Sequence, residues 1–188
     1  GVPDILKNTK QLMMPPLKLG WATRLKSDHF QFYQMVCEEF SKIIQIDPWW
    51  INPYFDRCSD VDFANQNNQE CLAEHASVLF QKIREKYAEY KIDQPPFLVV
   101  KADQGTYGMA VMMVRDPAEL ANLNRKQRTK MSSLKGGAAV TKVIMQEGVY
   151  TFETVGDDHG VAEPVVYHIG RHVVGGFYRI HKNRGIDE

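Results

Sequence analysis

A lysine and two glycines interrupt two apolar runs in the stretch FLVVKADQGTYGMAVMMV, residues 97–114. Lys101 closes the first run, and Gly105 and Gly108 precede the second. Glycines in a loop allow backbone N–H groups to approach an anion closely, and a lysine at the end of a strand adds positive charge beside them. The stretch therefore predicts a hairpin whose loop can bind phosphate.

The spacing of these residues excludes two common nucleotide loops. No Gly-Lys-Ser or Gly-Lys-Thr sequence occurs, so the loop is not of the Walker A type. Lys101 precedes the glycines, whereas the glycine-rich loop of protein kinases comes before its lysine. Taken by itself, the stretch is also compatible with an ordinary loop that follows a strand-end lysine.

Two helices are predicted ahead of this hairpin. The first has Ser27 and Asp28 at its cap and first turn and ends at Asp47-Pro48. Its apolar residues recur at helical spacing: Tyr33, Val36, Phe40, Ile43 and Ile44. The second runs from Asn68 to about Tyr90. Prolines in the first twenty-five residues predict turns there, and residues 47–69 predict an ordered loop without a strand.

The second half of the chain has the pattern of strands. We expect a hairpin over 97–114, a helix from Asp116-Pro117 to about Met131, and then strands at 143–147, 149–155, 161–169 and 172–181. The predicted fold class is α+β, with a helical N-terminal half followed by a largely antiparallel sheet. The predicted boundary between these parts lies between residues 96 and 97.

The overall composition favours no charged macromolecule as a partner. Lys and Arg number 23, as do Asp and Glu, so the formal net charge is zero. No apolar run approaches the length of a membrane-spanning helix. The three cysteines form no CxxC pair, which fits free thiols in a reducing compartment and predicts a cytoplasmic protein. Cys37 and Cys71 are interpreted as packing residues of helices.

Seven short motifs together resemble the proteobacterial-type glutamate–cysteine ligase (gamma-glutamylcysteine synthetase) family: GWATRLKSDHF, INPYF, VKADQGTYGM, LNRKQRTKM, QEGVYTFE, AEPVVY and VGGFYRIH. The resemblance implies an ATP-grasp-like fold, with the glycine loop as a flap hairpin. It also implies ATP-dependent ligation of the γ-carboxylate of L-glutamate to L-cysteine through an acyl phosphate, the first step of glutathione biosynthesis. ATP and Mg²⁺ are the implied cofactors, and glutamate, cysteine and ATP are the implied partners, without nucleic acid or membrane.

The resemblance also assigns residues to roles. Lys101 and Arg179 would act on the phosphates in catalysis. The nucleotide would be held by Lys26, Lys101, Gly105, Thr106, Tyr107, Gly108, Gln146, Glu147, Gly148 and Val149. Family members are longer on both sides and carry the metal ligands after this segment, so we expect no metal ligand here and an isolated chain without activity. We also expect residues 104–108 to be mobile without nucleotide and an apolar sheet face to be uncovered near residues 165–177.

Several alternatives stay open from the residues alone. The residues also fit another carboxylate–amine ligase, or a nucleotide- or RNA-binding module without catalysis. They are compatible with a homo-oligomer as well. Lys26 is also compatible with a solvated helix end, Arg179 with an exposed strand face, and Glu163 with a sheet edge or, less well, a metal ligand. The basic run at residues 125–135 lacks the aromatic residues that base stacking needs. His168 and His172 lack a third ligand for zinc.

Overall fold

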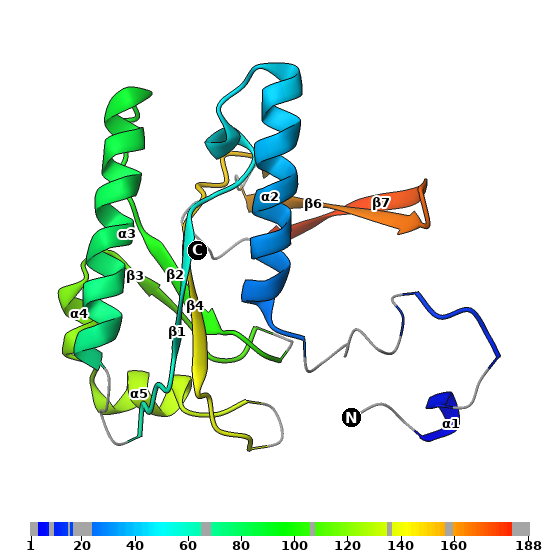
Figure 1. Cartoon of the computed structure of the whole chain (residues 1–188). Helices are drawn as coiled ribbons and strands as arrows, with labels where there is room; N and C mark the ends of the chain where they lie inside the picture. The colour runs from blue at the N-terminus through cyan, green and yellow to red at the C-terminus, as the bar shows by residue number, and fades with distance from the viewer. Residues whose placement is uncertain are drawn as a thin grey trace. The chain divides into compact units, whose positions relative to one another are not determined.

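The computed structural model describes residues 4–7, 10–14, 16, 24–64, 69–105, 108–134, 137–156 and 160–181 (Figure 1). The chain forms two compact units, Gly1–Glu147 and Gly148–Glu188, and each is described by itself. This division differs from the predicted boundary between residues 96 and 97. The reason is that a strand and a helix of the first half pair and pack with strands of the second half. Helix α1 (Asp4–Lys7) lies in the described part of the N-terminal segment.

The first unit is built around a four-stranded antiparallel sheet. Its strands lie in the order β1 (Phe55–Ser59), β4 (Lys142–Glu147), β2 (Leu98–Ala102) and β3 (Val111–Val114). β2 and β3 form the predicted hairpin, and β4 is the predicted strand at 143–147. The coarse prediction of a mixed α and β fold with antiparallel strands is confirmed.

Strand β1 corrects the prediction that residues 47–69 contain no strand. Among its five residues only the side chain of Cys58 is buried, so the alternation that marks a half-buried strand is too short to recognise. Pairing with β4 supplies the order, with Phe55 opposite Gln146 and Ser59 opposite Lys142. The short 3₁₀ helix η3 (Pro48–Trp50) lies ahead of the strand.

Helix α3 (Gln69–Glu89) covers one face of this sheet, as its apolar spacing predicts. Its buried side chains pack against every second residue of β2 and β4, which point to the same face of the sheet. The helix contributes Leu72, Ala76, Leu79, Phe80, Ile83 and Tyr87, and the strands contribute Leu98, Val100, Ala102, Val143 and Met145. This is the main hydrophobic core of the unit.

Helix α2 (Lys26–Ile44) lies on the opposite side of β1 from α3 (Figure 1). Phe30 contacts Phe55 of β1, with ring centroids 5.7 Å apart. The length of the helix is as predicted, but its apolar spacing does not mark a buried face. The side chains of Tyr33, Val36, Phe40, Ile43 and Ile44 are exposed by 40% to 78%.

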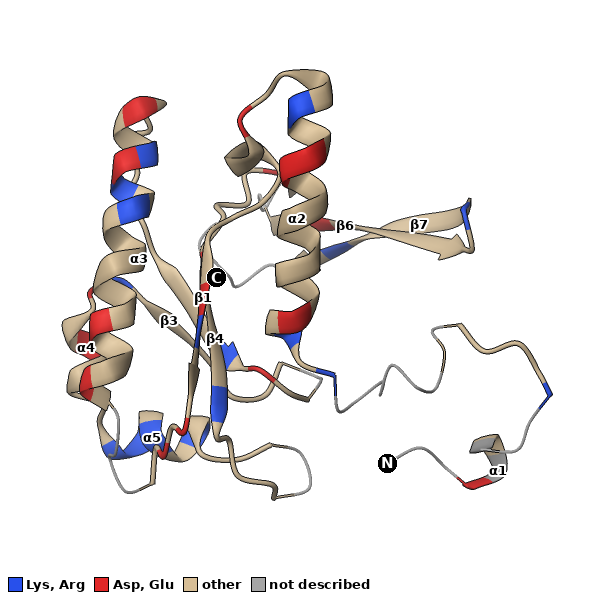
Figure 2. Cartoon of the chain, viewed as in Figure 1, with Lys and Arg blue, Asp and Glu red and all other residues tan. Residues whose placement is uncertain are grey.

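Two short helices replace the single helix predicted between residues 116 and 131. α4 (Ala118–Ala121) ends before its cap residue Asn122, and α5 (Arg125–Met131) begins after Asn124. The side chain of Asn124 accepts a bond from the backbone of Gln127, and the Gln127 side chain accepts one in return, so a capping box starts a new helix. Basic residues occur along α5, whose ribbon is largely blue in Figure 2.

The second unit is a three-stranded antiparallel sheet of β5 (Thr154–Val155), β6 (Gly160–Ile169) and β7 (His172–His181). β6 and β7 are predicted strands, joined by a turn at Gly170-Arg171. The strand predicted at 149–155 is reduced to the two residues of β5. The predicted apolar surface is confirmed, because Val166, Tyr167, Val173, Val174 and Phe177 are all exposed by about half or more. No helix in the described parts of the chain is long and apolar enough to cross a membrane.

The packing of α3 on the sheet leads to a test of the core. Phe80 is fully buried, so Phe80→Ala should lower the free energy of unfolding by about 3–5 kcal/mol through lost contacts and a cavity. Val78 lies on the same helix but is 54% exposed, so Val78→Ala should change it by about 0.5 kcal/mol or less. Urea unfolding followed by tryptophan fluorescence measures both, and equal losses would contradict the assigned core.

Candidate functional site

The first turn of α2 is bonded to the loop that follows β2. The backbone N–H of Ser27 donates to Oδ1 of Asp103 at 2.7 Å, and the Ser27 hydroxyl donates to Oδ2 at 2.6 Å. The backbone N–H of Lys26 donates to the carbonyl of Asp103 at 2.9 Å. Asp103 is buried, and it caps the helix from outside. Ser27 is therefore not the predicted cap, and Leu25 at the cap position makes no side-chain bond.

The ammonium group of Lys26 binds the glycine loop itself. Its Nζ donates to the carbonyls of Ala102 at 2.7 Å and of Gln104 and Gly105 at 3.1 Å, and the carbonyl of Asp103 lies at 3.4 Å. An ammonium group has three N–H donors, and these carbonyls occupy all of them. Burial lowers the pKa of Lys26, and Asp103 acts in the opposite direction. Lys26 lies at the predicted loop, and its direct contact with nucleotide stays a prediction.

Lys101 brings a second positive charge to the same place. It is the penultimate residue of β2, and its Nζ lies 5.8 Å from the ring centroid of Phe30. Burial, and then repulsion from Lys26, lowers the pKa of Lys101. Two cations beside one loop are stabilised when an anion joins them, so the pair fits the predicted phosphate contact.

The glycines are required by the conformation of the loop. Gly105 and Gly108 have φ of +85° and +66°, in the left-handed region that glycine adopts without strain. A Cβ atom on Gly105 would also lie 3.2 Å from Cδ2 of Leu134. Thr106 and Tyr107, and with them part of the segment predicted to be mobile, lie outside the described residues.

Gln146 and Glu147 lie on opposite faces of the sheet. Gln146 pairs with Val99, which shares the face of Lys101, whereas Glu147 pairs with Leu98 on the face covered by α3. Lys101 pairs with Ile144, so Glu147 also lies three residues, about 10 Å, further along β4. The strand therefore brings Gln146, and not Glu147, to the face of Lys101.

The carboxylate of Glu147 has partners within the protein. Its Oε2 accepts bonds from the indole Nε1 of Trp49 at 2.9 Å and from the backbone N–H of Tyr54 at 3.0 Å. Burial raises the pKa of Glu147, and these two bonds oppose the rise. Glu147 thus holds the aromatic loop ahead of β1. The ribose contact predicted for it stays a prediction.

The remaining predicted residues belong to the second unit. Gly148 is buried and Val149 is 64% exposed. Arg179 of β7 lies directly across from Glu163 of β6. The Nε of Arg179 donates to Oε2 of Glu163 at 2.8 Å, and the Nη2 atom donates to the same oxygen. The guanidinium is therefore engaged by Glu163, which is neither a bare sheet-edge residue nor a free metal ligand here.

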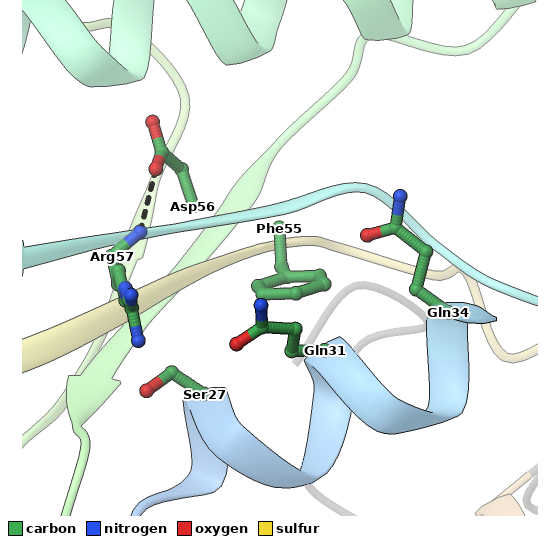
Figure 3. A pocket seen from close by; sticks show the side chains of 6 residues that line it. All are labelled: Ser27, Gln31, Gln34, Phe55, Asp56 and Arg57. Atoms are coloured by element: carbon green, nitrogen blue, oxygen red, sulfur yellow. Dashed lines mark hydrogen bonds between the residues drawn. The ribbon is translucent and has the colours of Figure 1, made fainter.

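A small cavity between α2 and β1 was not predicted from the sequence. It has a volume of about 230 Å³, and Figure 3 shows side chains from both elements around it. Its lining residues are Ser27, Gln31, Gln34, Phe55, Asp56 and Arg57. Two amides and a guanidinium can bind a carboxylate or another small polar group. The signal in the sequence is the spacing of Ser27, Gln31 and Gln34, which places them on one side of a helix.

Two comparisons with known proteins point to the same family. The family model GshA, glutamate-cysteine ligase, matches residues 1–188. Among solved structures, the chain is similar to the crystal structure of a protein from Methylobacillus flagellatus KT that is named provisionally as a gamma-glutamylcysteine synthetase. The two share 55% sequence identity with a TM-score of 0.87, over 100% of this chain and 44% of that one. No curated protein matches the chain.

The bonds between Asp103 and Ser27 predict a measurable contribution to stability. Asp103→Ala leaves the buried N–H and hydroxyl of Ser27 without acceptors and should lower the free energy of unfolding by about 1.5–3 kcal/mol. Asp93 is exposed, so Asp93→Ala should stay within about 0.5 kcal/mol of the wild type. Urea unfolding compares the two variants. A loss for Asp103→Ala no larger than that for Asp93→Ala would show that the cap does not hold α2.

Proposed function

The chain belongs to the glutamate–cysteine ligase family, and on this premise we propose that it forms part of an ATP-dependent enzyme that joins L-glutamate to L-cysteine in the first step of glutathione biosynthesis. The match over residues 1–188 supports the ligase role. Because the chain spans less than half of its solved relative, the proposal concerns the whole enzyme. We further propose an ATP-grasp-like fold in which the β2–β3 hairpin is the flap.

The observation that carries the ATP-dependent mechanism is the convergence of Lys26 and Lys101 at the glycine loop. In such a ligase the γ-carboxylate of glutamate accepts a phosphoryl group from ATP, and the amine of cysteine then attacks the acyl phosphate and releases phosphate. Such chemistry depends on positioning and on neutralising the negative charge of the phosphates. Lys101 would contact phosphate oxygens, while Lys26 would keep the carbonyls of the loop turned away from them.

Other residues of the chain have supporting roles in this proposal. Gln146 lies on the face of Lys101 and can bond a nucleotide base with its amide. Arg179 would exchange its partner Glu163 for the transferring phosphoryl group, to which a guanidinium binds with two parallel bonds. Mg²⁺ would neutralise the triphosphate when bound. Asp103 follows β2 directly, but Ser27 binds both of its oxygens, so we place the Mg²⁺ ligands in another part of the enzyme.

The cavity between α2 and β1 suits the amino-acid substrate better than the nucleotide. Its volume of about 230 Å³ is small, and Arg57, whose Nη1 lies 3.7 Å from Oδ1 of Asp28, would exchange that exposed ion pair for a substrate carboxylate. Phe55 and Arg57 pair with Gln146 and Ile144, so they share the sheet face of Lys101. A substrate carboxylate held here would lie on the side of the sheet from which the phosphates are bound.

The role of Lys101 predicts a loss of ATP affinity on substitution. In the full-length enzyme, Lys101→Ala should weaken ATP binding by about 1.5–3 kcal/mol, or roughly 10- to 150-fold, because a charge-assisted contact is lost. Lys142 is an exposed lysine at the start of β4, and Lys142→Ala should leave the affinity unchanged. Isothermal titration calorimetry measures both. Equal affinities for the two variants would remove the hairpin from the nucleotide site.

The lowered pKa of Lys101 predicts proton uptake on ATP binding. In the free protein, burial and Lys26 favour the neutral amine, whereas bound phosphate favours the ammonium and raises the pKa again. At alkaline pH, between the lowered and the ordinary lysine pKa, the enzyme should therefore take up protons as ATP binds. Calorimetry in buffers of different ionisation enthalpy measures this uptake. Lys101→Arg, which stays charged, should reduce it, and an unchanged uptake would count against phosphate contact at Lys101.

The ligase function is tested by coupling ADP release to both amino acids. The full-length enzyme with ATP and Mg²⁺ should release ADP only when glutamate and cysteine are both present, and the product should be γ-glutamylcysteine. Residues 1–188 alone should show no turnover. Release that depends on a different amine would favour another carboxylate–amine ligase, and release by neither protein would contradict the proposed activity.

A further inference from the structure

Three side chains with metal-binding atoms meet on the face of the sheet opposite Lys101. They are Cys58 of β1 and Cys71 and His75 of α3, and one ligand atom of each lies within 4.8 Å of the other two. Cys58 is buried, whereas Cys71 is exposed. The mechanism proposed above uses none of these residues.

The secondary structure explains why they meet. Cys58 and Asp56 alternate along β1, so both point toward α3, and pairing with Val143 and Met145 of β4 fixes their register. Cys71 and His75 are four residues apart on α3, so they share one side of the helix. Strand β1 and helix α3 thus each contribute two side chains to the same place.

The distances suit a tetrahedral zinc ion. With Zn–S bonds of about 2.3 Å, two sulfur ligands at the tetrahedral angle lie about 3.8 Å apart. The Sγ atoms of Cys58 and Cys71 are 3.8 Å apart. The Nδ1 atom of His75 lies 2.8 Å from Oδ2 of Asp56, and a carboxylate partner of this kind is the usual orienting contact of a zinc-binding histidine.

We propose that Cys58, Cys71 and His75 bind a zinc ion, with Asp56 holding Nδ1 of His75 so that Nε2 is the ligand, and with the fourth position open to water. The ion would tie the edge strand β1 to the first turns of α3. Binding must displace the thiol protons, and burial of Cys58, whose pKa is raised to about 12 in the metal-free protein, adds to that cost. His168 and His172, the pair considered from the sequence, flank the β6–β7 turn and belong to no such group among the described residues.

Metal content and affinity of the full-length protein test the site. Protein purified without chelators should contain zinc, bound by Cys58, Cys71 and His75. Competition with a chromophoric chelator gives the affinity of the protein for zinc. Cys71→Ser should lower that affinity by at least about 100-fold, and Asp56→Asn by about 10- to 100-fold. The matched control is Cys37→Ser, since Cys37 is a buried cysteine of α2 and not one of the three proposed ligands. Its zinc content and affinity should equal those of the wild type.

Cobalt substitution gives a spectroscopic signature of metal binding. Thiols that only pack against their neighbours would not produce it. The wild type and Cys37→Ser should show thiolate-to-cobalt charge transfer and the intense visible bands of a tetrahedral ion, and Cys71→Ser and His75→Ala should weaken them. Because Cys71 is exposed, Cys71→Ser should fold, and circular dichroism checks that it does. Zinc affinity equal in the wild type and Cys71→Ser would overturn the site. A Cys58–Cys71 disulfide in protein isolated with its thiols protected from air would overturn it as well.

Discussion

The buried carboxylate of Asp103 fixes the start of α2 against the end of β2, and the placement of Lys26 beside Lys101 depends on it. A buried carboxylate is costly unless its oxygens have donors, and Ser27 supplies one to each of them. With α2 held in this way, Lys26 reaches the carbonyls of the glycine loop and Phe30 lies beside Lys101. One acidic side chain therefore brings the helix, the loop and the two positive charges into a single arrangement.

The alternation of side chains along the strands divides the remaining chemistry between two faces. Lys101, Gln146 and Arg57 share the face on which α2 lies, where Arg57 lines the small cavity and Gln146 is buried. Cys58 and Glu147 point to the other face, where α3 and the aromatic loop enclose them. A shift of one residue in register would exchange these two sets. The antiparallel pairing of β1, β4 and β2 is therefore what keeps the candidate phosphate site and the candidate zinc site apart.

Much of the fold could be predicted from local patterns. The period of α3 is sustained over many residues, and the apolar runs of β2, β3 and β4 are bounded by glycine, proline or charge. β1 escaped prediction because five residues with one buried side chain carry too weak an alternation. The break between α4 and α5 depends on the capping box of Asn124 and Gln127, which competes locally with helix continuation. Ser27 has a side chain typical of a helix cap, but the carboxylate of Asp103, which is distant in the sequence, caps the helix instead.

The sequence by itself determined the family motifs, the glycine-bearing hairpin with Lys101 at its strand end, and the helices with long apolar periods. These features depend on neighbouring residues and on backbone preferences, which a sequence displays directly. Only the tertiary structure decided that Lys26 turns to the carbonyls of the loop, that Arg179 is engaged by Glu163, and that Glu147 faces away from Lys101. The tertiary structure also brought Cys58 close to Cys71 and His75. Such contacts arise from strand register and helix packing between distant segments, so spacing along the chain does not reveal them.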